Sequence, residues 1–235
     1  MVVSMRSNPG SFSRDDEFAV TELSSVRGVV LVEVSIDHPE APRESVLGEL
    51  HPAERAFACS KPGRRLVEFV AGRRALRVAL RHVGWGGDQP LLTGPQGRPE
   101  VPLGFTASVS HKDGLAFAVA APADSGRTLG IDCEVIGDRA RSSIARKILR
   151  PSELLRWQTT GSTWPALLEI FSTKEAIYKA LHPHVPRYIG FEEAEVDELG
   201  GIRLHLSGGE GPFRLHRHLS WDEQRLIVLV EAEPG

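Results

Sequence analysis

Cysteine, an excess of basic residues and long apolar runs are the features that this 235-residue sequence lacks. It contains only Cys59 and Cys133, neither in a Cys-x-x-Cys pattern, so we expect two free thiols in a reducing compartment rather than a disulfide framework. The formal net charge of -3 excludes the chain-wide basic surface that is typical of nucleic-acid-binding proteins. No apolar run approaches the ~18 residues that span a membrane, and the polar N-terminus lacks the apolar stretch of a signal peptide. These absences predict a cytoplasmic protein that binds neither nucleic acid nor membrane.

The apolar residues that are present predict a globular α+β protein. Hydrophobic residues make up 41% and charged residues 25% of the sequence, which is ordinary globular usage. Apolar periodicity predicts helices at residues 42–58, 64–83, 138–149 and 164–181. It predicts strands at residues 26–36, 105–110, 115–121 and 128–135, and further strands within 189–230.

The order of these elements predicts three parts along the chain. Residues 1–20 are rich in Ser, Asn, Gly and charge, and we expect them to form a flexible N-terminal tail. Residues 21–126 and 127–235 each combine helices with an antiparallel sheet, which predicts an N-terminal and a C-terminal α/β lobe. Because ligand sites occur preferentially between domains, we expect a site between the two lobes.

Two acidic residues alternate along the predicted strand 128–135. Asp132 and Glu134 are two positions apart, so they face the same side of the strand while Cys133 faces the other. Adjacent carboxylates repel each other unless a cation lies between them. Mg²⁺ suits such a pair, because it takes oxygen ligands and retains waters and substrate phosphates. The alternative is an exposed strand face with two solvated acids.

A second group of charged residues lies in the predicted helix 164–181. Glu175 and Lys179 are four positions apart and therefore share a helix face, and Lys174 flanks them. The segment thus supplies one carboxylate and two ammonium groups. An ordinary surface Glu–Lys pair has the same spacing, so the segment by itself does not distinguish a site from a solvated helix face.

Candidate phosphate ligands occur in the first half of the chain. Ser108 and Ser110 share a strand face and His111 precedes a glycine turn, so hydroxyls, an imidazole and loop amides could together hold a phosphate. A catalytic Ser–His pair is the rival interpretation, but the sequence has no Gly-x-Ser-x-Gly nucleophile motif. The helix 64–83 also carries arginines, whose planar guanidinium groups match phosphate geometry. The alternative is that these side chains are only solvated. They are Arg64, Arg65, Arg73, Arg74 and Arg77.

Taken in order, these segments resemble the 4'-phosphopantetheinyl transferase family. GIDCE at 130–134 is similar to the family's Gly-hydrophobic-Asp-x-Glu strand, and FSTKEAIYK at 171–179 to its aromatic-Ser/Cys-x-Lys-Glu-x-x-x-Lys helix. SVSHKDG at 108–114 is similar to its Ser-x-Ser/Thr-His segment. The match spans residues 50–195 and includes FVAGRRA at 69–75, GPQGRP at 94–99 and RYIGF at 187–191.

The resemblance implies a fold and an activity. Members with both lobes in one chain are intramolecular pseudo-dimers that bind coenzyme A in the cleft between the lobes. They transfer the 4'-phosphopantetheine group of coenzyme A to a serine of an acyl or peptidyl carrier protein and release 3',5'-ADP. We therefore expect a holo-[acyl-carrier-protein] synthase that uses Mg²⁺ or Mn²⁺. The single-chain branch activates carriers of siderophore biosynthesis, polyketide synthases and nonribosomal peptide synthetases, and a fused pseudo-dimer is expected to be monomeric.

The resemblance also implies roles for residues of this sequence. The metal would be held by Asp132, Glu134 and Glu175. Glu175 is the expected general base, directly or through a water, with Lys174 and Asp132 as further catalytic residues. Contacts to coenzyme A are expected from Arg65, Arg73, Gln96, Gly97, Arg98, Ser110, His111, Lys174 and Lys179. Gln96 stands where close relatives often carry a lysine, so we expect Arg98 to substitute for that phosphate contact.

Three other classes of function stay open at this point. A non-catalytic coenzyme A or carrier-binding module could keep the fold, although it has no need of the whole set of charged motif residues. An unrelated Mg²⁺-dependent phosphohydrolase could use the same carboxylates, and it would release 3',5'-ADP without any carrier. A nucleic-acid binder would need interleaved aromatic residues, which the arginine face of helix 64–83 lacks.

Overall fold

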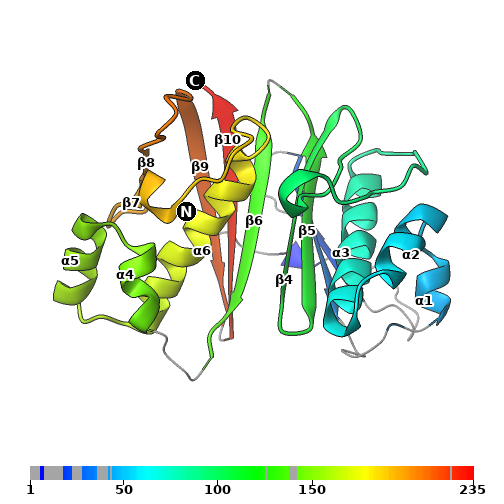
Figure 1. The fold of residues 1–235 in the computed structure, drawn as a ribbon, viewed down its shortest axis with the longest axis horizontal. Helices are drawn as coiled ribbons and strands as arrows, with labels where there is room; N and C mark the ends of the chain where they lie inside the picture. Colours follow the sequence, from blue (N-terminus) through cyan, green and yellow to red (C-terminus); the bar gives the residue numbers. More distant parts are fainter. Residues whose placement is uncertain are drawn as a thin grey trace. The chain divides into compact units, whose positions relative to one another are not determined.

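The computed structural model shows two compact units, each with helices packed on an antiparallel sheet (Figure 1). It describes residues 6–7, 18–22, 28–35, 42, 44–124, 126–137, 142–222 and 224–235. One unit holds the described residues up to Asp124, and the other holds those from Gly126 onward. The predicted α+β class with two lobes is confirmed. No helix in the described ranges is long and apolar enough to cross a membrane.

The N-terminal unit is built on a five-stranded antiparallel sheet of order β1-β2-β3-β5-β4. Its strands are β1 (Arg6–Ser7), β2 (Phe18–Glu22), β3 (Val30–Ser35), β4 (Phe105–Lys112) and β5 (Leu115–Pro122). Strands β4 and β5 form a hairpin whose turn has Asp113 at φ 44° and Gly114 at φ 87°. An Asp-Gly pair is favoured there, because both residues tolerate positive φ in a tight hairpin turn.

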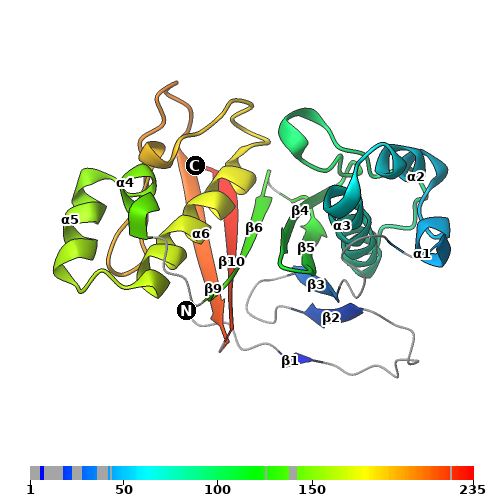
Figure 2. The same ribbon diagram turned by 60° about the horizontal axis from the view of Figure 1, so that its bottom comes forward.

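We expected residues 1–20 to form a flexible tail, but strands β1 and β2 include some of them (Figure 2). Strand β2 pairs with β3, and β1 pairs in turn with β2. The physical reason is that β3 would present unpaired backbone N–H and C=O groups at the edge of the sheet without β2, and a further strand satisfies them whatever its composition. The other residues of the expected tail lie outside the described ranges.

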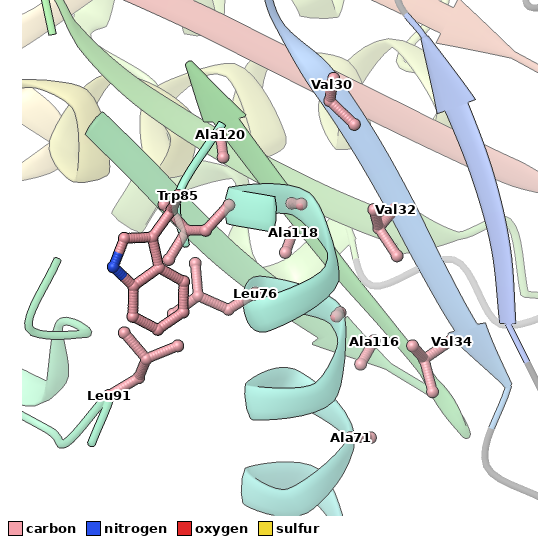
Figure 3. Packing of buried hydrophobic residues seen from close by; sticks show 13 residues of the cluster. Val30, Val32, Val34, Ala71, Leu76, Trp85, Leu91, Ala116, Ala118 and Ala120 are labelled. Carbon is pink, nitrogen blue, oxygen red and sulfur yellow. The ribbon is translucent and has the colours of Figure 1, made fainter. Parts of the chain in front are cut away.

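Helix α3 (Gly63–His82) packs against β3, β4 and β5, as its periodicity predicted. Figure 3 shows alternate side chains of β3 and β5 directed at one face of the helix, with small alanines on β5 that let the helix approach closely. Trp85 and Leu91, from the chain that follows α3, join the same buried cluster. The labelled members of the cluster are Val30, Val32, Val34, Ala71, Leu76, Trp85, Leu91, Ala116, Ala118 and Ala120.

The helix predicted at residues 42–58 is in fact two helices, α1 (Glu44–Gly48) and α2 (Pro52–Cys59). His51 caps α2, because its Nδ1 accepts from the backbone N–H of Ala53 at 3.2 Å while Glu54 accepts from the backbone N–H of His51 at 3.1 Å. Pro52 then takes the first helical position, where its missing N–H costs nothing. A proline there cannot donate to a preceding turn, so a new helix begins.

The C-terminal unit has a three-stranded antiparallel sheet of order β6-β10-β9 with α6 packed on one face (Figure 1). These elements are β6 (Thr128–Val135), β9 (Phe213–Trp221), β10 (Arg225–Pro234) and α6 (Trp164–Leu181). Val228 and Val230 alternate along β10 and belong to the same buried cluster as Ile177 and Leu181 of α6. The strong helix and the strand predicted in this half are thereby confirmed.

Smaller elements flank α6 in the C-terminal unit. They are α4 (Ala145–Ile148), α5 (Pro151–Thr159), the pair β7 (Ala194–Val196) and β8 (Ile202–Leu204), and 3-10 turns at Ser142–Ile144 and Phe191–Glu193. The helix predicted at 138–149 is thus a 3-10 turn and one α-helical turn, and residues 138–141 lie outside the described ranges. It ends within one residue of the predicted position, before Pro151, which disfavours helical backbone at Arg150.

Candidate active site

Strand β6 presents its two acidic residues toward α6. Gly130, Asp132 and Glu134 alternate along one face of the strand, as the spacing predicted. Asp132 is 6% exposed and Glu134 is half-buried. Asp132 contacts α6 directly, so the acids are not a solvated strand face.

Gly130 allows α6 to lie directly on β6. A Cβ added to Gly130 would come within 1.9 Å of the carbonyl oxygen of Ala176 and 2.5 Å of the backbone nitrogen of Ala180. Thr128 ties the same elements together, since its Oγ1 donates to the carbonyl oxygen of Ala180 at 2.6 Å. Glycine in a strand marks such close approaches of another backbone. Gly130 therefore sets the separation between the acids of β6 and the charged residues of α6.

Two side chains from α6 hold the carboxylate of Asp132. Ser172 Oγ donates to Oδ2 at 2.8 Å, and Lys179 Nζ donates to Oδ1 at 2.8 Å. Lys179 also donates to the carbonyl oxygen of Ile131 at 2.9 Å. Ser172 is fully buried, whereas a quarter of the Lys179 side chain (25%) is exposed. The structure thus brings the strand motif and the helix motif together at Asp132.

Glu175 interacts electrostatically with Asp132, Glu134 and Lys179. Burial raises the pKa of Glu175, the charge of Lys179 lowers it, and the charges of Asp132 and Glu134 raise it again. Three carboxylates that influence one another in a half-buried site repel each other, and a divalent cation relieves that repulsion.

The three carboxylates do not, however, form a closed ligand set. Within the described part of the chain, no three Asp, Glu, His or Cys side chains converge on a point that could hold a metal ion. Asp132 is paired with Lys179 instead. The donors still fit Mg²⁺ in kind, because they are carboxylate oxygens from two facing elements and are too few to exclude waters or phosphates.

Lys174 lies apart from this group, which corrects the role that we expected for it. Its buried ammonium donates to the carbonyl oxygens of Ile148 at 2.9 Å and Phe191 at 3.0 Å, and to Glu153 Oε2 at 2.6 Å. These partners use all three N–H donors of the lysine. Burial lowers the pKa of Lys174, although the hydrogen bond to Glu153 opposes the shift. Lys174 therefore ties α6 to its flanking elements and is not available to a phosphate.

Arg73 is likewise committed to the fold of the N-terminal unit. Its guanidinium donates to the carbonyl oxygens of Leu91 and Leu92 and to Thr93 Oγ1, and it lies 4.4 Å from the ring centre of Phe69. Burial lowers the pKa of Arg73 to about 10. Arg73 is one turn from Phe69, so it shares the inward face of α3 and is 5% exposed. This corrects our expectation that Arg73 contacts a phosphate.

The other residues expected to contact coenzyme A all belong to the N-terminal unit, apart from Lys179. Arg65 is exposed at the start of α3. Ser110 is buried on β4, and His111 beside it is half exposed with Nδ1 3.9 Å from Glu68 Oε1. The remaining three are exposed: Gln96 and Gly97 lie in a 3-10 turn at Pro95–Gly97, and Arg98 follows it.

The turn at Pro95–Gly97 has unusual backbone geometry. Gln96 has φ 59° and Gly97 has φ 87°, and both values lie in the left-handed region. Consecutive turn amides of this kind form anion-binding concavities in other proteins. The loop therefore stays compatible with the contact that the sequence predicted.

A pocket opens beside Glu175 within the C-terminal unit. It lies between α6 and the segment 188–194 and has a cavity volume of about 90 Å³. The rings of Tyr178 and Tyr188 lie 5.9 Å apart in its wall, and Tyr188 is 70% exposed. Its lining consists of Lys174, Glu175, Ile177, Tyr178, Tyr188, Ile189, Gly190, Phe191 and Ala194.

Ion pairs of Arg187 hold one wall of the pocket in place. Arg187 donates to both carboxylate oxygens of Glu193 at 2.9 and 2.8 Å, and its Nε donates to Glu210 at 2.6 Å. The hydrogen bond from Arg187 holds the pKa of Glu193 down at about 2. Such forked pairs fix geometry as well as charge, so the segment that carries Tyr188 is held in place.

Sequence reasoning missed several residues of this site. The segment RYIGF pointed to Tyr188 through the family resemblance, but nothing indicated that Tyr178 would face it. Ser172 stands inside the helix motif, yet periodicity does not show that its hydroxyl reaches the strand. Glu153 follows Arg150 at the spacing of a capping box, which signals a helix start and not a partner for Lys174.

Known proteins of one family match both units of the chain. The 4'-phosphopantetheinyl transferase N-terminal domain matches residues 53–121, and the 4'-phosphopantetheinyl transferase superfamily matches residues 128–229. The 4'-phosphopantetheinyl transferase PptT of Mycobacterium tuberculosis is 32% identical over 193 residues, which cover 76% of this chain and 83% of the relative. Npt of Nocardia iowensis is 32% identical over 62% of this chain and 65% of its own length. Svp of Streptomyces mobaraensis is 35% identical over 152 residues, which cover 63% of this chain and 60% of the relative.

The comparisons and the structure converge on the same two segments. The superfamily match includes both β6 and α6, whose motifs meet at Asp132. The match to the mycobacterial enzyme extends over most of both chains. This protein therefore belongs to the 4'-phosphopantetheinyl transferase superfamily and is an enzyme of that class.

Proposed function

We propose that this enzyme transfers the 4'-phosphopantetheine arm of coenzyme A to a serine hydroxyl of an acyl or peptidyl carrier protein and releases 3',5'-ADP. The family uses coenzyme A as substrate and generally a divalent metal. The observation that supports the proposal most is the charged group of β6 and α6, in which Asp132, Glu134 and Glu175 lie near Lys179. A transfer between two anionic partners needs such a group, because positive charge must be held where negative charge builds up.

The divalent metal, for which we propose Mg²⁺ or Mn²⁺, would be held by Asp132, Glu134 and Glu175. When bound, it would supply charge neutralisation at the pyrophosphate of coenzyme A. Ser172 supports this arrangement from behind, because its hydroxyl fixes one oxygen of Asp132 and so orients the carboxylate.

Glu175 is the proposed general base that takes the proton of the carrier serine. A serine hydroxyl is a weak nucleophile at neutral pH and needs a base. Burial raises the pKa of Glu175, which makes its carboxylate more basic than that of an exposed glutamate. Lys179 lies one turn later on the same helix face and would supply positive charge to the transferring phosphate.

The pocket beside Glu175 is the proposed site of the pantetheine arm. The arm is uncharged and slender, and the pocket offers the side chains of Ile177, Tyr188 and Phe191 with polar atoms at its edge. Pockets that orient a ligand combine such an apolar lining with a few polar groups. Because Glu175 lines the pocket, an arm that fills it would bring its phosphate to the acidic group.

Residues of the N-terminal unit are proposed to bind the nucleotide and phosphates of coenzyme A. Arg65 and His111 are exposed side chains, and the buried Ser110 would add a hydroxyl from the other face of β4. Gln96, Gly97 and Arg98 would contribute turn amides and a guanidinium. Lys174 is left out of this proposal because the fold uses its three donors, and Arg73 because it is buried and bonded to residues 91–93.

The physiological carrier is proposed to belong to a polyketide, nonribosomal peptide or siderophore assembly system of the cytoplasm. The support is that both family domains occur in one chain, as in the branch that serves those carriers. We further propose that the enzyme acts as a monomer, since both halves of the pseudo-dimer are already joined. Light scattering during size-exclusion chromatography tests the monomer, and a higher mass would overturn it.

Intact-mass analysis of carriers tests the reaction. The full chain is incubated with coenzyme A, Mg²⁺ and a panel of apo-carriers, and each carrier is weighed. We expect the gain of one phosphopantetheine, abolished by EDTA. Release of 3',5'-ADP without a carrier would favour a phosphohydrolase, and coenzyme A binding without any mass gain would favour a binding module. Either outcome would reject the proposed transfer.

A further inference from the structure

The ammonium of Lys179 is paired with Asp132, one of the three carboxylates of the proposed metal site. Its Nζ donates to Asp132 Oδ1 at 2.8 Å and to the carbonyl oxygen of Ile131 at 2.9 Å. The Asp132 side chain is 9% exposed and the Lys179 side chain 25% exposed, so the lysine is the more accessible partner of the pair. A cation that binds Asp132 therefore binds a carboxylate that already has a positive partner.

Asp132 cannot turn away from this pair without losing a second contact. Its other oxygen, Oδ2, accepts from the buried hydroxyl of Ser172 at 2.8 Å. A carboxylate held at both oxygens exchanges partners only if one partner leaves. Lys179 is the partner that can leave, because its ammonium ends a flexible four-carbon stem that is partly exposed.

The ion pair of Lys179 and Asp132 also changes the total charge of the three carboxylates. Glu175 and Glu134 influence each other, yet across the described residues no three such side chains converge on a metal position. An ammonium on Asp132 already neutralises one of the three charges, and it repels a further cation at short range. The ion pair thus neutralises Asp132 with a charge that the chain itself supplies.

We propose that Lys179 is a built-in counter-ion that competes with the divalent metal for Asp132, so that metal and coenzyme A bind cooperatively. This inference rests on the metal site of the proposed function. In the free protein the lysine holds Asp132, and the metal binds weakly. The pyrophosphate of coenzyme A offers the ammonium a stronger anionic partner, which releases Asp132 to the metal. Because linkage is reciprocal, the metal must raise the affinity for coenzyme A by the same factor.

Manganese titration of the full chain, followed by the EPR signal of free Mn²⁺, tests the competition without turnover. Wild type and Lys179→Met are titrated with Mn²⁺ alone and with Mn²⁺ in the presence of coenzyme A. We expect Lys179→Met to bind Mn²⁺ alone more tightly by on the order of 10-fold, within the usual range of coupling between sites. We expect coenzyme A to raise the affinity for Mn²⁺ in the wild type and to raise it much less in Lys179→Met.

Three matched variants control the titration. Lys179→Arg keeps the charge and should bind Mn²⁺ alone as weakly as the wild type. Lys147→Met removes an exposed charge from α4 of the same unit and should leave binding unchanged. Adding Asp132→Asn to Lys179→Met should abolish the gain in affinity. Lys179→Gln replaces Lys179→Met in every comparison if the methionine variant does not fold.

Unchanged or weaker Mn²⁺ binding by Lys179→Met would overturn the inference. An equal gain in Lys147→Met would also overturn it, since the effect would then be one of net charge. A gain that survives Asp132→Asn would place the metal elsewhere and would equally contradict the competition for Asp132. The proposed function fails on a different measurement, namely the absence of carrier labelling by the wild type with Mg²⁺ and coenzyme A.

Discussion

The hydroxyl of Ser172 lies 2.8 Å from Oδ2 of Asp132, so a fully buried helix residue orients the carboxylate of the facing strand. The contact joins α6 to β6 at the point where the two family motifs meet. In metal sites, partners that orient a ligand are worth about 10–100-fold in metal affinity or activity. Ser172 is therefore a positioning residue for the proposed metal site.

Replacing Ser172 by alanine should weaken the affinity for the metal more than it lowers the maximal rate. Ser172→Ala removes the donor to Asp132, so the Mg²⁺ concentration for half-maximal carrier labelling should rise about 10-fold or more. Labelling at saturating Mg²⁺ should recover most of the wild-type rate. Ser172→Thr keeps the hydroxyl and is the matched control. An unchanged Mg²⁺ dependence in Ser172→Ala would show that the contact has no bearing on the metal.

The acidic group itself should be indispensable for turnover. Asp132→Asn and Glu175→Gln keep the shapes of the side chains but remove a proposed ligand and the proposed base. Each should lower the rate of carrier labelling by at least ~10²-fold, the scale of one positioned catalytic group. Glu198→Gln changes an exposed acid between β7 and β8 and should label carriers normally. Near-normal labelling by either site variant would reject the assignment.

Gly130→Ala should destabilise the C-terminal unit. The added methyl group meets the carbonyl oxygen of Ala176 at 1.9 Å, so β6 and α6 must move apart. Overpacking of this kind typically costs about 1–3 kcal/mol. Gly137→Ala is the control, because nothing lies within 4 Å of its new Cβ. Denaturant unfolding of both variants measures the difference, and equal stabilities would contradict the close approach.

Lys174→Met should reduce stability far more than it reduces coenzyme A binding. The lysine is buried against Glu153, and removing one partner of a buried ion pair typically costs about 3–5 kcal/mol. Lys147→Met removes an exposed lysine and should cost little. Urea unfolding gives the stabilities, and calorimetry at low temperature gives the coenzyme A affinity of the folded variant. A large loss of affinity with unchanged stability would restore the phosphate role that the structure removes.

The raised pKa of Glu175 predicts an unusual pH dependence of stability in the metal-free protein. The folded state binds this proton more tightly than the unfolded chain does. The free energy of unfolding should therefore fall as pH rises from the ordinary pKa of glutamate through the raised pKa of Glu175. Glu175→Gln removes the titrating group, so in EDTA it should be more stable than the wild type at neutral pH. A less stable variant under those conditions would contradict the repulsion that we infer.

Motif spacing predicted which charged side chains share a face, because neighbouring positions alone decide that geometry. Asp132 and Glu134 share a strand face because side chains alternate along any strand, and Glu175 and Lys179 share a helix face because they are one turn apart. The structure adds the contact between these faces through Lys179. The capping pair of His51 and Glu54 shows the opposite case, since a single predicted helix is divided by local chemistry that periodicity does not register.

The sequence by itself determined the family, the α+β class and which charged residues share a face, because these follow from residue order and from the periods of helix and strand. Only the tertiary structure decided which of those residues face the site. Lys174 and Glu175 are neighbours in one motif, yet a step of one residue along a helix turns the side chain toward different surroundings. Lys174 turns to Glu153 and is buried, whereas Glu175 turns to Asp132 and Lys179. What lies in each direction is set by segments distant in the chain, and so burial and pairing depend on packing that no local pattern encodes.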